Sequence, residues 1–162
     1  MGNGKFVNVS DQCGDGMQGK HSARGVAFDD LDNDGRIDAV IVNSREPPTI
    51  LRNESPRTGR WLQIQLRGVK CNRDAVGARV RVVAGDLIQI DEVHSGRGYQ
   101  GHFGSRLHFG LGKHDRVDRV EVRWPGGGTD VFQDVDVDQL VTLTQGGQLT
   151  RGHVPPPRKS LP

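Results

Sequence analysis

Hydrophobic and polar residues alternate over most of the chain beyond its first third. In WLQIQLR, the side chains of Leu62, Ile64 and Leu66 share one side of an extended segment, and Gln63 and Gln65 share the other. Six further segments show the same alternation: 77–83, 87–93, 106–112, 118–124, 129–135 and 139–145. A period of two predicts strands with one buried face, so the two glutamines should face solvent. No window of useful length has the 3.6-residue period of a helix, which favours an antiparallel β-sandwich or barrel.

Shorter runs of this kind occupy the first third of the chain, separated by polar, glycine-containing connections. Four runs have the composition of strands: NGKFVNV (3–9), RGVAF (24–28), DAVIVN (38–43) and TILRN (49–53). Pro47 and Pro48 follow the third run. Because proline lacks a backbone N–H group, the chain must reverse there or run along a sheet edge. The order of strand, loop, strand, turn and strand is typical of one propeller blade.

The loop between the second and third runs, DDLDNDGRID (residues 29–38), places carboxylates at alternate positions. Counted from Asp30 as position one, positions three, five, six, seven and nine are Asp32, Asp34, Gly35, Arg36 and Asp38. This spacing suits a hard cation that takes six to eight oxygen ligands at about 2.3–2.6 Å, and Ca²⁺ fits it better than Mg²⁺, which keeps its waters. A turn rich in Asp and Asn without an ion is the alternative. Mutual repulsion of four uncompensated carboxylates favours the ion.

The acidic loop is not an EF-hand, because position twelve is Ile41 instead of a glutamate and the flanking runs are strands. A polar segment, SPRTGR, separates this region from the longer alternating segments. We therefore expect an all-β protein with three parts. They are a propeller-like calcium-loop blade over residues 1–57, an antiparallel β-sandwich or barrel over residues 58–147, and a Pro-rich basic tail over residues 148–162, expected to be disordered.

Residues 24–53 resemble the FG-GAP or VCBS repeat, the calcium-loop blade of integrin-type β-propellers, and NGKFVNV resembles the closing strand of a preceding blade. The resemblance implies these Ca²⁺ ligands: the side chains of Asp30, Asp32, Asp34 and Asp38 and the backbone carbonyl of Arg36. Such repeats occur in arrays, but we find one. A single repeat cannot bury both faces. Three arrangements follow: the C-terminal part of a longer propeller protein, packing on the following domain, or self-association through the lone blade.

The second part of the chain resembles the ASPIC/UnbV domain over residues 61–147, in NRDAVGARVRV, SGRGYQGHFGSRLHFGLG and VDRVEVRWPGG. In that family the domain follows FG-GAP repeats at the C-terminus of secreted or surface proteins, and the order here is the same. The resemblance implies a recognition or adhesion role outside the cytoplasm, with a protein or glycan ligand at a surface and no catalytic residues. Where relatives tend to carry a Ser-Gln pair, this chain has Gly101 and His102.

Composition narrows the possible partners. Among 162 residues, 22 Lys and Arg oppose 20 Asp and Glu, and the arginines are scattered, so we expect no nucleic-acid partner. No apolar stretch reaches the roughly 18–20 residues of a membrane helix, so membrane insertion is not expected. The N-terminus has no secretory signal pattern. Two cysteines do not make a disulfide framework, so a bridge between Cys13 and Cys71 is not favoured.

GRGYQG, residues 96–101, matches the dinucleotide-binding fingerprint, but a strand follows it where that fingerprint needs a helix. Tyr99 would either cover the sandwich core or contact a sugar ring. His102 is the neighbouring candidate contact. The alternative function is therefore a carbohydrate-binding accessory domain of an enzyme that acts on polysaccharide. We expect the chain itself not to be an enzyme, since no acid and base pair lies outside the acidic loop.

Overall fold

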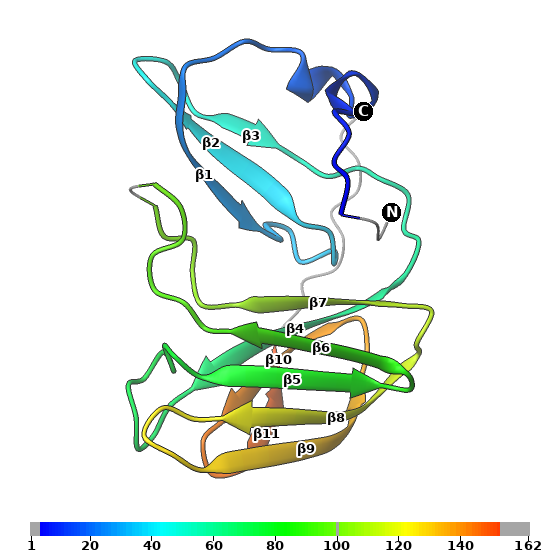
Figure 1. Cartoon of the computed structure of the whole chain (residues 1–162), viewed down its shortest axis with the longest axis vertical. Coiled ribbons are helices and arrows are strands. Elements are labelled where there is room, and N and C mark those ends of the chain that lie inside the picture. Colours follow the sequence, from blue (N-terminus) through cyan, green and yellow to red (C-terminus); the bar gives the residue numbers. More distant parts are fainter. Residues whose placement is uncertain (1–3, 100, 153–162) are drawn as a thin grey trace.

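The computed structural model describes residues 4–99 and 101–152, which form eleven strands in three sheets (Figure 1). Two short 3₁₀ turns, η1 (Ser10–Gln12) and η2 (Asp15–Met17), precede the first strand. Within the described part of the chain, no helix has the length and apolar character of a membrane span. The predicted all-β fold is confirmed.

Three antiparallel strands form the N-terminal sheet, in the order β1-β2-β3. They are β1 (Ala23–Asp29), β2 (Asp38–Asn43) and β3 (Thr49–Leu51). The main hydrophobic cluster of the described residues contains no side chain of this sheet. Large apolar side chains on both of its faces stay exposed, among them Phe28 at 49% and Ile50 at 65%. The sheet therefore has no core of its own among the described residues.

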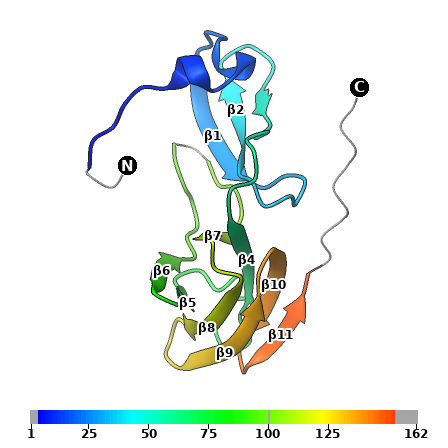
Figure 2. The same ribbon diagram turned by 90° about the vertical axis from the view of Figure 1, so that its right-hand side faces the viewer.

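The remaining strands form two four-stranded sheets that face each other as a sandwich (Figure 2). The β4 sheet has the order β11-β10-β4-β7, with β4 (Arg60–Arg67), β7 (Leu107–Gly112), β10 (Gln139–Thr144) and β11 (Gln148–Arg151). The β5 sheet has the order β6-β5-β8-β9, with β5 (Arg79–Ala84), β6 (Leu87–Glu92), β8 (Arg116–Arg123) and β9 (Thr129–Asp136). Neither sheet closes on itself, so the architecture is a sandwich and not a barrel.

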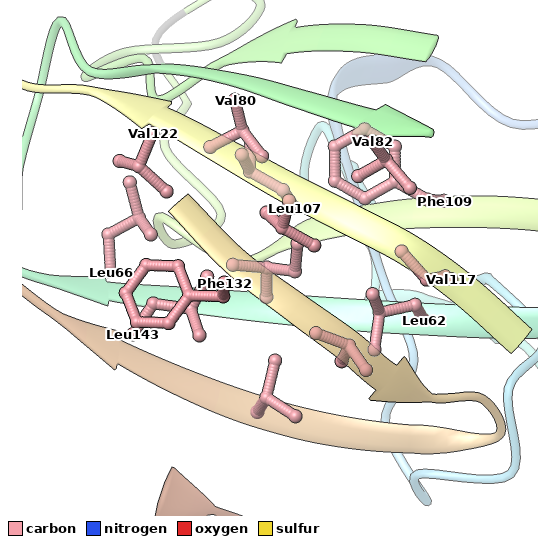
Figure 3. Close-up of a cluster of buried hydrophobic side chains, with 14 of the residues drawn as sticks. Leu62, Leu66, Val80, Val82, Leu107, Phe109, Val117, Val122, Phe132 and Leu143 are labelled. Atoms are coloured by element: carbon pink, nitrogen blue, oxygen red, sulfur yellow. The ribbon is translucent and has the colours of Figure 1, made fainter. Parts of the chain in front are cut away.

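The core lies between the two sheets, where alternate side chains of both meet (Figure 3). Leu62 and Leu66 of β4 and Phe109 of β7 point inward from one sheet, and Val80 and Val122 point inward from the other. Each of these five side chains is at most 2% exposed. The alternation in the sequence therefore identified the buried face of these strands correctly, because a strand directs successive side chains to opposite sides.

Three sequence expectations about the strands are wrong. The sandwich is not purely antiparallel: β10 runs parallel to β4, with Gln139 opposite Leu62, because β10 follows β9 of the other sheet and does not return from β4 by a hairpin. Residues 4–9 form no strand, and Phe6 is fully exposed, since no described strand pairs with this segment. The segment assigned to the tail begins with β11, which pairs with β10. Residues 153–162 lie outside the described part.

A histidine and an aspartate join two turns at the end of the sandwich. His114 Nε2 lies 2.9 Å from Asp86 Oδ1, and His114 Nδ1 lies 2.8 Å from the Leu111 carbonyl oxygen. The hydrogen bond to Asp86, with that to Leu111, raises the pKa of His114 above its ordinary 6.5, although neighbouring Lys113 opposes this. The same pair lowers the pKa of Asp86 below its ordinary 3.8.

This pair predicts a pH-dependent stability. The folded-state pKa of His114 is raised. Its contribution to folding stability is therefore complete below about pH 6.5 and is lost as the pH rises through the raised pKa. The contribution of Asp86 is present above about pH 3.8 and is lost only as the pH falls through its lowered pKa. We expect the native protein to melt slightly above a His114→Gln variant between these values, and this margin to shrink toward alkaline pH. A margin in melting temperature that does not change with pH would contradict this.

Candidate functional site

The acidic loop, residues 29–38, folds around the carboxylate of Asp30, which is completely buried. Asp30 Oδ1 accepts a hydrogen bond from the Asp34 backbone amide at 2.9 Å, and Asp30 Oδ2 accepts one from the Gly35 amide at 2.7 Å. Gly35 has φ 89° and Asn33 has φ 57°, so two left-handed residues curl the chain back over this carboxylate. This curl brings carboxylates of Asp30, Asp32 and Asp38 close together.

Asp38 closes the loop from its other end. Its Oδ2 accepts from the Leu31 amide at 3.0 Å, and its Oδ1 accepts from the Asn53 amide at 2.8 Å. Asn53 also donates from its side chain to the Ile37 carbonyl at 3.2 Å. The chain that follows β3 is therefore joined to the loop, and Asp38 is only 4% exposed.

Carboxylate oxygens of Asp30, Asp32 and Asp38 lie within 4.8 Å of one another. Two ligands on opposite sides of a calcium ion at about 2.4 Å would be separated by a similar distance, so one ion can reach all three. Asp32 Oδ1 is buried and has no hydrogen-bond partner among the described residues. Its other oxygen accepts from Arg52 at 2.8 Å. These three residues fit a hard cation in charge and spacing.

Asp34 does not lie in this group of three carboxylates. Its side chain forms an ion pair with Arg36, its Oδ1 also accepts from the Arg36 amide at 2.9 Å, and its backbone carbonyl accepts from Arg57. The predicted repulsion among four carboxylates is therefore smaller than the sequence indicates, because Arg36 and Arg52 each neutralise one of them. The roles of Asp34 and of the Arg36 carbonyl as ligands stay predictions.

Burial dominates the electrostatics of the site. It raises the pKa of Asp30 above its ordinary value, while the amides of Gly35 and Asp34 and the side chain of Gln63 oppose the change. Burial also lowers the pKa of His108, against the attraction of Asp30. A cation beside Asp30 would favour its ionised form, since an opposite charge offsets the cost of removing a carboxylate from water.

The sandwich contributes residues that sequence reasoning missed. Gln63, predicted to face solvent, is completely buried and donates to Asp30 Oδ2 at 2.6 Å. Trp61 lies on the same face of β4, packed against Gly35, and its ring stacks on His108 with centroids 6.1 Å apart. The prediction failed because the acidic loop covers this part of the outer face of β4. The sequence did contain a sign of this cover: Trp61, a large aromatic residue, lies on the face that was expected to face solvent.

Tyr99 and His102 lie in the connection between β6 and β7, which extends from the sandwich to β1 (Figure 1). With Arg24 and apolar residues of β1 and β2, they line a groove of about 300 Å³. Tyr99 is 66% exposed and lines this groove, so it does not cover the sandwich core as one reading of the sequence proposed. Phe103 of the same connection contacts Phe28 of β1 edge to face, with centroids 6.2 Å apart.

Three comparisons relate the chain to known proteins. A family model described as ASPIC and UnbV matches residues 68–150. Cartilage acidic protein 1 of Xenopus tropicalis is 29% identical over 120 residues, which cover 70% of this chain and 18% of that protein. The chain thus spans less than a fifth of this relative. A crystal structure of a proposed cell adhesion protein from Bacteroides ovatus gives a TM-score of 0.36 at 10% identity, covering 79% of this chain and 59% of that chain.

The contact between Gly35 and Trp61 predicts a large effect of a single methyl group. A Cβ atom at Gly35 would overlap the Trp61 indole ring, and φ there is left-handed. Gly126→Ala is the matched control, because Gly126 has φ +82° but open space around a Cβ atom. We expect Gly126→Ala to cost about 1 kcal/mol from its backbone alone, and Gly35→Ala to cost about 1–3 kcal/mol more from overlap. Chemical denaturation measures both, and equal costs would contradict the packing of Trp61 on the loop.

Proposed function

The chain belongs to the ASPIC and UnbV family, and from this premise we propose that it is a calcium-binding recognition or adhesion module that acts outside the cytoplasm. The observation that carries the calcium assignment is the group of Asp30, Asp32 and Asp38 oxygens around the unpartnered Asp32 Oδ1. Several carboxylates on one loop favour Ca²⁺ over Mg²⁺, which keeps several waters and needs a near-octahedral shell.

The proposed ion has a structural role. It would join β1, β2 and the chain after β3, because Asp30 and Asp38 bound the loop and Asp38 also accepts from Asn53. No reaction step is assigned to it, and we propose that the chain is not an enzyme. Calcium sites of extracellular modules have dissociation constants of about 10⁻⁴–10⁻³ M, which suits a stabilising ion in a calcium-rich medium.

Location and assembly are parts of the same proposal. A location outside the cytoplasm is supported by the family and by a relative named after cartilage. We propose that residues 24–53 are one FG-GAP or VCBS blade, supported by the three-stranded sheet and its acidic loop. The exposed apolar side chains on both faces of this sheet suit a neighbouring blade in a longer protein or self-association with a second copy. A protein or glycan at a surface is the proposed ligand.

Calcium removal tests the main proposal. At millimolar calcium and an affinity near that of extracellular modules, binding adds on the order of 1 kcal/mol of stability. We expect a chelator to lower the melting temperature of the native chain, and Asp32→Ala to abolish this response. Asp74→Ala, at an exposed site in the β4–β5 connection, is the control and should respond as the native chain does. Identical melting curves of the native chain with calcium and with chelator would refute the proposal.

The groove beside Tyr99 supports a second candidate function, a carbohydrate-binding accessory domain. An exposed aromatic ring offers a sugar an apolar face, while Arg24 and His102 offer hydrogen-bond donors in the same groove. The floor consists of residues from β1 and β2, so the site requires the N-terminal sheet as well as the β6–β7 connection.

A glycan array separates the two candidates. If the groove binds sugar, Tyr99→Ala should weaken binding about tenfold or more, since truncation of a central aromatic commonly has this effect. Tyr99→Phe keeps the ring and should retain most of the affinity. Neither variant alters a residue of the acidic loop, so the calcium response should persist in both. Absence of glycan binding by the native chain, or equal binding by Tyr99→Ala, would eliminate this candidate.

A further inference from the structure

The acidic loop and the sandwich meet through polar groups, of which Asp30 and Gln63 are buried and Arg106 and Asp29 half-buried. Gln63 of β4 donates from Nε2 to Asp30 Oδ2 at 2.6 Å. Arg106, just before β7, donates to Gln63 Oε1 at 2.9 Å and to Asn33 Oδ1 at 2.7 Å. Its other terminal nitrogen lies 3.2 Å from Asp29 Oδ2. Two sandwich side chains therefore contact three residues of the acidic loop.

These contacts fix the orientation of the Gln63 amide. An arginine can only donate, so Gln63 Oε1 must be the atom facing Arg106, and the NH₂ group must face Asp30. His108 Nδ1, 3.3 Å from Gln63 Nε2, accepts the second hydrogen of that group when the ring is neutral. Burial lowers the pKa of His108 and so favours the neutral ring. Gln63 thus presents a fixed donor to one carboxylate oxygen of the proposed calcium site.

We propose that Gln63 is a positioning residue of the calcium site, so that docking of the sandwich raises the affinity of the acidic loop for calcium. This inference rests on the proposed calcium function. Hydrogen bonds that orient a ligating carboxylate commonly change metal affinity about 10- to 100-fold. Because linkage is reciprocal, bound calcium strengthens the contact between the loop and the sandwich by the same factor. The calcium site then belongs to the joint between the two parts of the chain, and not to the N-terminal sheet alone.

Isothermal titration of the whole chain with calcium chloride tests the inference. Gln63→Leu removes the donor and keeps a side chain of similar size, and we expect its dissociation constant to rise about tenfold. Gln65→Leu is the matched control: Gln65 shares the outer face of β4 but donates to Ser105 at 2.8 Å, and no described hydrogen bond joins it to the acidic loop. This control should bind calcium as the native chain does. A merely structural role of Gln63 would lower the melting temperature without calcium and leave the dissociation constant unchanged.

A second variant and a second measurement keep the test valid if Gln63→Leu does not fold. Arg106→Gln removes the ion pair with Asp29 and shortens the reach to Asn33, so it should also weaken calcium binding severalfold. Trp61 packs against Gly35, so its fluorescence in a Trp124→Phe background should change as calcium binds, with the midpoint shifted to higher calcium by Gln63→Leu. Circular dichroism establishes that each variant is folded before titration.

The outcomes separate this inference from the function on which it rests. If the native chain shows neither heat nor a fluorescence change with calcium, the proposed calcium function fails and this inference fails with it. If the native chain binds calcium and both Gln63→Leu and Arg106→Gln bind with the same dissociation constant, only this inference is overturned. Weakened binding in these two variants, with native binding by Gln65→Leu, supports it.

Discussion

A carboxylate that is removed from water has to be satisfied by hydrogen-bond donors or by a cation, and Asp30 imposes this requirement on the rest of the structure. It is fully buried and accepts from two amides of its own loop and from Gln63 of the sandwich. The hydrogen bonds from the two amides hold the loop in its shape, and the hydrogen bond from Gln63 holds the sandwich against that loop. Local folding and the contact between the two parts of the chain thus depend on one side chain.

This dependence explains how a sheet without a core keeps a defined position. The N-terminal sheet contributes nothing to the main hydrophobic cluster, so its packing energy is small. Its position depends on hydrogen bonds from Gln63 and Arg106 to the acidic loop and on the Trp61 ring against Gly35. The edge-to-face contact of Phe103 with Phe28 of β1 adds to these. Directional contacts tolerate little displacement, because a hydrogen bond weakens steeply with poor geometry. The joint is therefore specific although it is small.

The sequence predicted those features that depend on neighbours along the chain. Burial of Leu62 follows from the period of two, and the curl of the acidic loop follows from its Asp and Gly spacing. Gln63 was placed in solvent because the period of two identifies two faces of a strand and does not tell what covers the outer one. The direction of β10 depends on a crossover between sheets, and residues 4–9 need a partner strand that alternation cannot supply. These three misses are long-range, whereas the pairing of Asp34 with Arg36, two residues away, is a local contact that the sequence reading also missed.

The balance of charges around the acidic loop supports a divalent ion. Of the five aspartates between residues 29 and 38, three have arginine partners: Asp29 with Arg106, Asp32 with Arg52, and Asp34 with Arg36. The two others, Asp30 and Asp38, are the ones that bound the loop, and the structure pairs them with N–H donors alone. Two buried carboxylates then carry charge that no side chain balances among the described residues. One divalent cation between them and Asp32 matches that charge, and a monovalent ion would leave half of it uncompensated.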